Sequence, residues 1–252
     1  MRRIKLTLEY DGTAFSGWQV QPGKRTVQGV LQESISKMMG SRTRVIGSGR
    51  TDAGVHALGQ VAHADVARNI PAVNIMMGLN SILPRDVRVL DCEDASGTFH
   101  AQRSATGKIY RYTILTGSRP TALDRHRVWH IRQKLDMESM VEAAGYILGE
   151  HDFEAFKSAG DDTYTVRDLR KLDIRGEGRH IVLTLEANGF LKHMVRNITG
   201  ALVEVGLGKL TPGDIKNLLD SRSRENAPKK APPQGLVLVS VTYGNHNAIP
   251  MS

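Results

Sequence analysis

Near its start the chain reads Arg3-Ile4-Lys5-Leu6-Thr7-Leu8-Glu9-Tyr10, and Asp11-Gly12 follows directly. Apolar side chains recur at every second position, so one face of the stretch is apolar and the other is polar. This period predicts a half-buried β-strand that ends at a turn. A helix is predicted next, because Thr26 can cap a segment whose apolar residues recur at helical spacing before Gly40 stops it.

Three further strands and one further helix are predicted in the first part of the chain, residues 1–104. Short strands are predicted over residues 44–46, 60–66 and 87–90. Pro71 suits the first helical position of a helix over Val73–Leu79, because proline lacks only an N–H that is unpaired there anyway. The predicted order of the first part is therefore β-α-β-β-α-β.

The same order of elements recurs after Lys108, with one additional helix. The predicted elements are a strand over 109–115, a helix capped by Asp136 and ended by Gly149, strands over 165–174 and 180–187, a helix opened by Asn188 or Gly189, a helix after Thr211-Pro212-Gly213-Asp214, and a strand over 236–241. The second part therefore also predicts β-α-β-β-α-β, with one insertion.

Two such parts predict an α+β fold built from two βαββαβ halves, residues 1–104 and residues 105–252. We expect a mixed sheet with helices on one face and a central cleft between the halves. This topology is that of ferredoxin-like and RNA-recognition modules. Because one fold can support many chemistries, the function has to be argued from particular residues.

Composition narrows the class of protein without fixing it. The 252 residues contain 40% hydrophobic residues and carry a formal net charge of +8. This charge favours a polyanionic partner, although solubility alone explains such a surplus equally well. The charge is spread evenly, at +4 on each side of Ser104, so no basic tail is expected.

Nothing in the sequence predicts a membrane protein. No stretch approaches the roughly 18 apolar residues that a membrane-spanning helix needs, and the first ten residues contain no unbroken apolar run. Cys92 is the single cysteine, so no internal disulfide can form. We expect a soluble, cytoplasmic protein in which Cys92 is a small buried residue.

The glycine-rich segment Gly47-Ser48-Gly49-Arg50-Thr51-Asp52-Ala53-Gly54-Val55-His56-Ala57 holds the first candidate site. It is not a phosphate-binding loop, since no Lys-Ser/Thr pair follows its last glycine and no dinucleotide-type glycine pattern opens a helix. Arg50 and Asp52 are two residues apart, so in an extended loop their side chains point the same way. They are expected to bind one ligand together, or to form a local ion pair in a surface turn.

A metal site is a weaker alternative. Asp52 and His56 are four residues apart and could share an ion on a helix, together with Asp11 or His63. The intervening Ala53-Gly54-Val55 is a poor helix start, however, and no second pair with metal-ligand spacing occurs. We therefore expect no metal, and we expect His63 to be a structural or half-exposed histidine.

Aromatic residues provide two further candidates. The loop over residues 11–19 carries Phe15 and Trp18, which could stack on nucleic-acid bases or fill an edge of the core. Tyr110 and Tyr112 share one face of a predicted strand, which favours packing. A tyrosine at the edge of a cleft can instead stack on a base that is extracted from an RNA helix.

One helix face carries polar residues opposite much of its apolar stripe. Lys192, Arg196 and Thr199 lie on this face of the helix predicted after Gly189. The simpler interpretation is a solvated face. The alternatives are a contact with phosphate, or a charge partner for Asp52.

Taken together, these segments resemble the tRNA pseudouridine synthase A family over nearly the whole chain. The Arg-Thr-Asp-Ala-Gly-Val-His core is the most specific match. The matching segments are Tyr10-Asp11-Gly12-Thr13, Gly17-Trp18-Gln19, Thr26-Val27-Gln28, Gly49 to His56, Lys108-Ile109-Tyr110-Arg111-Tyr112, His151-Asp152-Phe153, Phe190-Leu191 with Met194-Val195-Arg196-Asn197, and Gly235-Leu236.

The resemblance implies isomerisation of uridine to pseudouridine at positions 38–40 of the tRNA anticodon stem-loop. It also implies a homodimer, a flipped-out target base, and neither a metal nor an organic cofactor. By position in the motifs, Asp52 matches the catalytic aspartate and Arg50 the arginine beside it. Tyr110 matches the tyrosine that stacks on the target uracil, and Arg196 a basic residue that pairs with the aspartate.

The chain departs from the family pattern at two places. The family usually reads His-Ala-Arg-x-Ser-Ala, whereas this chain reads His-Ala-Gln-Arg-Ser-Ala over residues 100–105. In an extended segment this shift moves the guanidinium of Arg103 to the opposite face, so we assign it no RNA contact. Lys229-Lys230 stands where the family tends to have Pro-Thr, inside a predicted C-terminal loop.

Two other classes of function stay open from the residues alone. A noncatalytic RNA-binding or RNA-folding factor on the same scaffold would bind tRNA and leave its nucleosides unchanged. A metal-dependent hydrolase using Asp52 and His56 would lose its activity in EDTA, although the motif supplies only two ligands for it.

Overall fold

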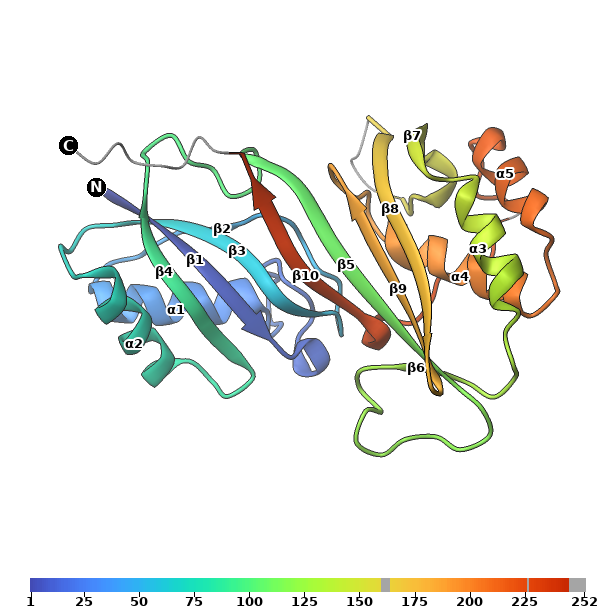
Figure 1. The fold of residues 1–252 in the computed structure, drawn as a ribbon. Helices are drawn as coiled ribbons and strands as arrows, with labels where there is room; N and C mark the ends of the chain where they lie inside the picture. The colour runs from blue at the N-terminus through green and yellow to red at the C-terminus, as the bar shows by residue number, and fades with distance from the viewer. Residues whose placement is uncertain (160–163, 226, 245–252) are drawn as a thin grey trace. The chain divides into compact units, whose positions relative to one another are not determined.

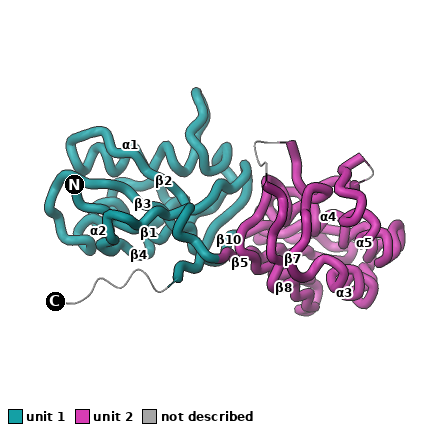
Figure 2. The backbone as a smooth tube through the Cα atoms, turned by 90° about the horizontal axis from the view of Figure 1, so that it is seen from above, with its two compact units in different colours: residues 1–106, 238–252 teal, residues 107–237 magenta. Residues whose placement is uncertain are grey.

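The chain folds into two compact units. The computed structural model describes residues 1–159, 164–225 and 227–244. Unit 1 comprises residues 1–106 together with 238–252, and unit 2 comprises residues 107–237 (Figure 2). Each unit has its own strands and helices, so the predicted α+β class with two halves is confirmed.

Unit 1 has the predicted β-α-β-β-α-β order, followed by a strand from the end of the chain (Figure 1). Its strands run β4-β1-β3-β10, with β2 paired to β3. The elements are β1 (Arg2–Tyr10), η1 (Gly12–Ala14), α1 (Val27–Met39), β2 (Val45–Gly47), β3 (His56–Val66), α2 (Ala72–Ile82), β4 (Val87–Ala95) and most of β10 (Leu236–Tyr243).

The alternation of apolar and polar residues in β1 explains why this strand lies inside the sheet of unit 1. Ile4, Leu6 and Leu8 of β1 have no exposed surface, while β1 pairs antiparallel with β3 on one side and β4 on the other. Helix α1 begins where the sequence predicts it, because the Thr26 side chain accepts a hydrogen bond from the Gly29 N–H. Gly40 ends it in the left-handed region, at φ 71°.

The last strand belongs largely to unit 1, which differs from the predicted boundary of 105–252 for the second half. Gly59 of β3 allows this pairing, since a Cβ there would lie 2.5 Å from the Val239 carbonyl oxygen. The Tyr243 hydroxyl donates a hydrogen bond of 2.8 Å to the Ala101 carbonyl. These contacts join residues far apart in the sequence, so local periodicity does not reveal them.

The strands of unit 2 run in the order β5-β9-β8-β7, with β6 pairing parallel to β5. Strand β5 pairs antiparallel with β9, as do β7 with β8 and β8 with β9, so the strand pairing in this unit is mixed. The elements are β5 (Ala105–Thr116), β6 (Trp129–Ile131), α3 (Met137–Gly145), β7 (Gly149–Asp152), η2 (Glu154–Phe156), β8 (Val166–Glu177), β9 (His180–Ala187), α4 (Met194–Gly206), α5 (Pro212–Ser221) and η3 (Pro233–Gly235).

Helix α4 is the core element of unit 2. All of its residues except Glu204 are buried, and α3 and α5 both contact it. Gly200 lets the backbone of the following loop approach closely, because a Cβ there would lie 2.2 Å from the Lys229 carbonyl oxygen. Helix α5 has the predicted start, in which Thr211 and Asp214 form a reciprocal capping box.

Several predicted helix boundaries are wrong. Helix α3 ends at Gly145, and Gly149 instead begins β7 with φ 97°. Helix α4 begins at Met194 rather than at Asn188 or Gly189, because the backbone N–H of Asn188 donates to the Asp168 carbonyl of β8 at 3.2 Å. In unit 1, Pro71 caps α2 instead of forming its first turn.

Cys92 is buried with 8% of its surface exposed, as the sequence predicts, and burial raises the pKa of its thiol to about 12. Among the described residues, no helix is both long enough and apolar enough to cross a membrane.

Candidate active site

The glycine-rich segment forms a tight loop between β2 and β3 of unit 1. The Val55 N–H donates a hydrogen bond of 3.1 Å to the Asp52 carbonyl, and Gly54 takes the left-handed conformation at φ 79°. The Asp52 side chain is half-buried, whereas Arg50 is exposed. The loop over residues 48–55, called the aspartate loop below, therefore presents its carboxylate from a fixed turn.

The backbone of residues 12–18 packs directly against the aspartate loop. A Cβ at Gly12 would lie 2.0 Å from the Val55 carbonyl oxygen, and a Cβ at Gly17 would lie 2.7 Å from the Thr51 carbonyl oxygen. The Trp18 N–H donates to that same Thr51 carbonyl at 3.0 Å. Only glycine permits these two approaches, so the Asp-Gly-Thr and Gly-Trp-Gln motifs form the support of the aspartate loop.

The two aromatic residues of the supporting segment face inward. Phe15 is 3% exposed and Trp18 is 2% exposed. The Trp18 ring lies against Gly47, where a Cβ would be 2.5 Å from the ring. The interpretation of these residues as core filling is therefore confirmed, and neither ring is available to stack on a base.

A buried polar network holds the other side of the loop. The Tyr10 hydroxyl lies 2.7 Å from Thr51 Oγ1, and Gln60 Nε2 donates to the Gly49 carbonyl at 3.0 Å. Ser48 Oγ donates to Gln60 Oε1 at 2.6 Å. Burial raises the pKa of Tyr10 to about 12, so its hydroxyl stays neutral and keeps its hydrogen bond at physiological pH.

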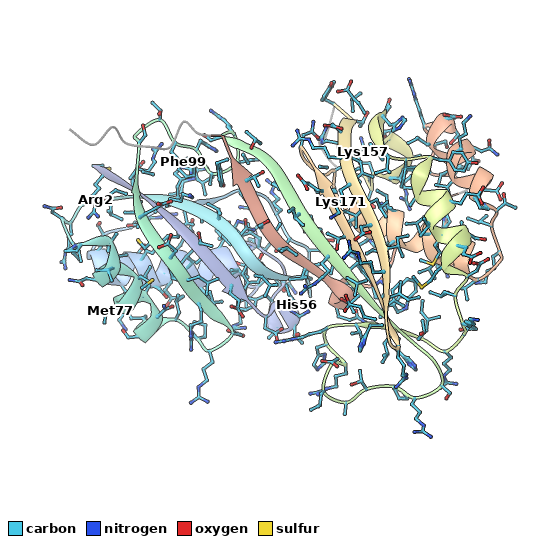
Figure 3. All side chains as sticks on the ribbon, viewed as in Figure 1. Arg2, His56, Met77, Phe99, Lys157 and Lys171 are labelled. Carbon is cyan, nitrogen blue, oxygen red and sulfur yellow. The ribbon has the colours of Figure 1, made fainter. Side chains whose placement is uncertain are left out.

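His56, labelled in Figure 3, ties the supporting segment to β3. The Gly12 N–H donates to His56 Nδ1 at 3.1 Å, and Asp11 Oδ1 lies 3.2 Å from the same nitrogen. Asp11 also accepts hydrogen bonds from the backbone and hydroxyl of Thr13. In the described part of the chain, no group of three His, Cys, Asp or Glu side chains is arranged to hold a metal ion.

His63 has the structural role that the sequence predicts. It is 3% exposed, and its Nδ1 accepts a hydrogen bond of 3.1 Å from the Ala101 N–H. Burial, together with the positive charge of Arg3, lowers the pKa of His63 to about 4. The ring is therefore neutral at pH 7 and serves as an acceptor within unit 1.

The other two candidate residues lie in unit 2. Tyr110 is on β5 with 8% of its surface exposed, and its ring meets Phe190 edge to face at a centroid distance of 5.1 Å. Arg196 is on α4, also 8% exposed, and its Nε donates to the Ala231 carbonyl at 2.8 Å. Arg50 and Asp52 are thus together in one loop, while Tyr110 and Arg196 are both in the other unit.

The interpretation of Lys192, Arg196 and Thr199 as a solvated helix face is wrong for two of these three residues. Arg196 is buried, and Thr199 is fully buried with its hydroxyl donating to the Val195 carbonyl. Lys192 is exposed and precedes the helix, donating from Nζ to the Ala159 carbonyl at 2.8 Å. A buried guanidinium on this helix is a costly feature that solvation does not explain.

The packing role that the sequence predicts for Tyr112 of β5 is confirmed, because its side chain is fully buried, whereas Lys108 of the same strand was assigned no role. The Tyr112 hydroxyl donates to the Pro232 carbonyl at 2.8 Å, and Gly235 lets the backbone lie against its ring. Lys108 precedes Tyr110 by two positions, so both side chains leave the same face of the strand. Burial and the nearby positive charge of Arg167 lower the pKa of Lys108 to about 8. The two-residue spacing of Lys108 and Tyr110 is the signal that could have placed Lys108 beside the candidate tyrosine.

Comparison with known proteins gives a consistent result. A family model described as tRNA pseudouridine synthase matches residues 7–102 and 143–244. The chain belongs to the tRNA pseudouridine synthase family. Its activity is therefore that of an isomerase which forms pseudouridine in tRNA.

Full-length relatives support this membership. "tRNA pseudouridine synthase A 2" of Clostridium perfringens (strain 13 / Type A) is 46% identical over 244 residues, covering 96% of this chain and 100% of the relative. The "tRNA pseudouridine synthase A" of Citrifermentans bemidjiense is 46% identical, covering 96% and 98%. That of Myxococcus xanthus is 44% identical, covering 96% and 92%. The resemblance deduced from the motifs is thereby confirmed.

The close backbone contact at Gly12 leads to a first prediction. In Gly12→Ala the added methyl would overlap the Val55 carbonyl, so the aspartate loop must shift. We expect about 1–3 kcal/mol of destabilisation. A displacement of about 1 Å at a catalytic group can cost roughly 100-fold in rate, so kcat for pseudouridine formation should fall by about that factor.

Gly97→Ala is the matched control for Gly12→Ala. Nothing lies within 4 Å of a Cβ at Gly97, which is also in unit 1. Urea unfolding and single-turnover rates should both stay at the level of the parent chain for this variant. Equal rates for Gly12→Ala and the parent would contradict the role assigned to this contact.

The lowered pKa of His63 predicts a pH dependence of stability. Because its folded pKa of about 4 lies below the ordinary value, the neutral ring stabilises the fold above about pH 6.5. That stabilisation is lost as the pH falls from about 6.5 to 4, by up to roughly 3 kcal/mol. Asparagine keeps an acceptor for Ala101 without titrating, so the stability of His63→Asn should fall less over this range.

Trp18 fluorescence in a Trp129→Phe background can report this loss, since Trp18 is buried in unit 1. Guanidinium unfolding at pH 7 and pH 4.5 gives the two free energies. His126→Asn, which replaces an exposed histidine, should keep the pH dependence of the parent. The same pH dependence in His63→Asn and the parent would show that His63 is not buried in neutral form.

Proposed function

We propose that this isomerase modifies uridine at positions 38–40 of the tRNA anticodon stem-loop, with Asp52 as its catalytic group. The observation that carries this proposal is a half-buried carboxylate on a turn that is supported by two glycine contacts and a buried polar network. Catalysis depends on holding a reacting group within a fraction of an ångström of its productive position. The residues around Asp52 meet this requirement.

The reaction needs no second substrate. The bond between N1 of uracil and C1′ of ribose breaks, the base turns, and a bond between C5 and C1′ forms, while a proton leaves C5 and N1 gains one. Asp52 can attack C1′, add to C6 of the uracil, or remove the 2′ hydrogen, and all three routes start from an ionised carboxylate. Because the same base must detach and then rejoin, holding it in the site matters as much as acid–base strength.

Arg50 and Arg196 are proposed to keep that carboxylate ionised. Arg50 is in the same loop, two residues from Asp52. Arg196 carries a guanidinium that is buried in unit 2, and a buried cation is stabilised by a carboxylate partner. We propose Asp52 as that partner during the reaction, since a positive charge nearby favours the charged form of an aspartate.

Tyr110 is proposed to stack on the target uracil. Its ring is held by the edge-to-face contact with Phe190, so it offers a pre-oriented surface to a base that has left the RNA stack. The hydroxyl can then accept or relay the proton that leaves C5. Phe15 and Trp18 are not assigned this role, because both rings fill the core of unit 1 and the Trp18 ring lies against Gly47.

The partners in this proposal are tRNA and a second copy of the chain. A homodimer follows from the resemblance to the family, as does a reaction that uses no cofactor. A cytoplasmic location belongs to the same proposal, and a single buried cysteine is compatible with a reducing compartment.

Removal of the carboxylate should abolish the reaction. An anticodon stem-loop labelled in uridine is incubated with the parent chain, with Asp52→Ala and with Asp91→Ala, which replaces an exposed aspartate on β4. The parent chain and Asp91→Ala should convert uridine equally. Asp52→Ala should form no pseudouridine while its affinity for the RNA is retained.

Product from Asp52→Ala at the parent rate would refute the catalytic assignment. Two other outcomes would refute the function itself. RNA binding by the parent chain with no change in nucleoside composition would indicate a noncatalytic RNA-binding factor. Activity that EDTA abolishes would indicate metal-dependent chemistry.

Tyr110 should affect turnover more than affinity. In Tyr110→Ala the stacking surface is lost, so kcat should fall by at least 100-fold, while the Kd for RNA changes by less than tenfold. Tyr110→Phe keeps the ring and removes the hydroxyl, which separates stacking from proton transfer. Tyr112→Phe serves as the control within the same strand, and unchanged turnover in Tyr110→Ala would contradict the assignment.

A further inference from the structure

The segment between β5 and α3 concentrates positive charge in unit 2. Residues 116–134 contain five Lys or Arg residues and a single acidic residue, Asp124. Their net charge of +4 is half of the +8 carried by the whole chain, in 19 residues. Figure 1 shows most of this segment as the long green loop that leads from β5 to β6.

The loop is fastened to the sheet at its two ends. The Gly117 N–H donates to the Ile131 carbonyl at 3.0 Å, and the His130 ring nitrogen lies 2.6 Å from the Gly117 carbonyl. Arg179, from the turn between β8 and β9, donates to the carbonyls of Thr116 and Arg119. This contact adds a sixth cation to the same end of the sheet.

All six cations of this region are exposed, and we call them the basic surface. It consists of Arg119, Arg125, Arg127, Arg132, Lys134 and Arg179. The guanidinium groups of Arg125 and Arg179 donate to neutral carbonyls, as from Arg125 to Ala122 at 2.7 Å. The acidic residues nearby are Asp124, Glu177 and Asp136, and Asp136 is engaged in capping α3.

Several exposed cations elsewhere in unit 2 are paired with carboxylates. Arg175 Nε lies 2.7 Å from Asp173, and Lys209 Nζ lies 3.0 Å from Glu204. In the part of the chain that the structure describes, no residue of the basic surface forms such an ion pair. Lys134 interacts electrostatically with Asp136, but the region keeps an excess of positive charge. Like charges in excess repel one another, so this arrangement favours a polyanionic partner.

The chemistry of the surface favours a phosphate backbone over an acidic protein. Five of its six cations are arginines, whose planar guanidinium binds phosphate oxygens in pairs. A protein interface needs an apolar centre, and Leu123 is the only exposed large hydrophobic residue described in residues 116–134. Phosphate contacts need no such centre.

The position of the surface relative to Tyr110 can be estimated within unit 2. Tyr110 and Thr116 are six residues apart on β5, which corresponds to about 20 Å along the strand. Phosphates follow one another at about 3.4 Å along each strand of a duplex, so this distance spans roughly six of them. A base at Tyr110 and a stem at the basic surface can therefore belong to one RNA.

We propose that the basic surface binds the phosphate backbone of the tRNA stem, several nucleotides away from the uridine that is modified. This inference rests on the proposed role of Tyr110 at the target base. Phosphate contacts set the position and affinity of the RNA and take no part in the chemistry. Loss of the basic surface should therefore raise the Kd for RNA and weaken its salt dependence, and should leave kcat at saturating RNA unchanged.

The test compares two triple variants that each remove three positive charges from unit 2. Arg125→Gln, Arg127→Gln and Arg132→Gln together alter the basic surface. Arg175→Gln, Lys209→Gln and Lys216→Gln together alter cations that are paired with carboxylates. The Kd for an unmodified tRNA transcript is measured between 50 and 200 mM salt for both variants and the parent chain.

For the first variant we expect Kd to rise at least tenfold at 50 mM salt. The slope of log K against log salt should become shallower by about 2 to 3, since each lost phosphate contact changes it by about 0.9. The control variant should match the parent. The single variant Arg127→Glu provides a second comparison should the triple variant fold poorly, and it should also weaken binding.

Three outcomes would overturn this inference. Equal losses in both triple variants would show a general effect of net charge, and unchanged Kd in the first variant would show no contact. A change in oligomeric state by light scattering without a change in RNA affinity would assign the surface to a protein partner. The proposed function fails separately, when the parent chain forms no pseudouridine in the stem-loop, whatever its affinity.

Discussion

The aspartate loop depends on two positions at which the supporting backbone has no Cβ. At Gly12 and Gly17 the main chain of the supporting segment comes so close to Val55 and Thr51 that any larger residue would displace the loop. The contact is made by backbone atoms, which cannot change rotamer to relieve a clash. The conformation that presents Asp52 is thus fixed by sterics before any side-chain interaction is counted.

The buried polar network beside the aspartate loop adds directional hydrogen bonds to this steric support. Tyr10, Thr51 and Gln60 are buried and hydrogen-bonded, and Tyr10 stays neutral because burial raises its pKa to about 12. A buried polar group without a hydrogen-bond partner would destabilise the fold. Each of these side chains is therefore held in the orientation that keeps its hydrogen bonds. A reaction that detaches and rejoins a single base has no external reactant to select. Precise positioning of the reacting groups is then a large part of what the protein contributes.

The sequence alone predicts the order of elements over residues 1–106, because the strands there alternate clearly and α1 has a side-chain cap at Thr26. Strand β10 of unit 1 comes from the end of the chain, and the sequence assigns it to the other half. Short strands such as β6, with three residues, contain too few alternations to be recognised. The start of α4 was misplaced because Asn188 is bonded to β8, an interaction that no local pattern records. The burial of Arg196 depends on Ala231, 35 residues away, and was missed for the same reason.

The candidate residues were found through motif resemblance, while their physical support became visible only in the fold. Asp52 and Arg50 could be placed together from their spacing. The central claim is that the aspartate loop catalyses isomerisation at the anticodon stem-loop. Nucleoside mapping of tRNA, before and after incubation with the chain, tests it most directly. Pseudouridine should appear at positions 38–40 and nowhere else, whereas pseudouridine only outside this stem-loop, or none at all, would contradict the claim.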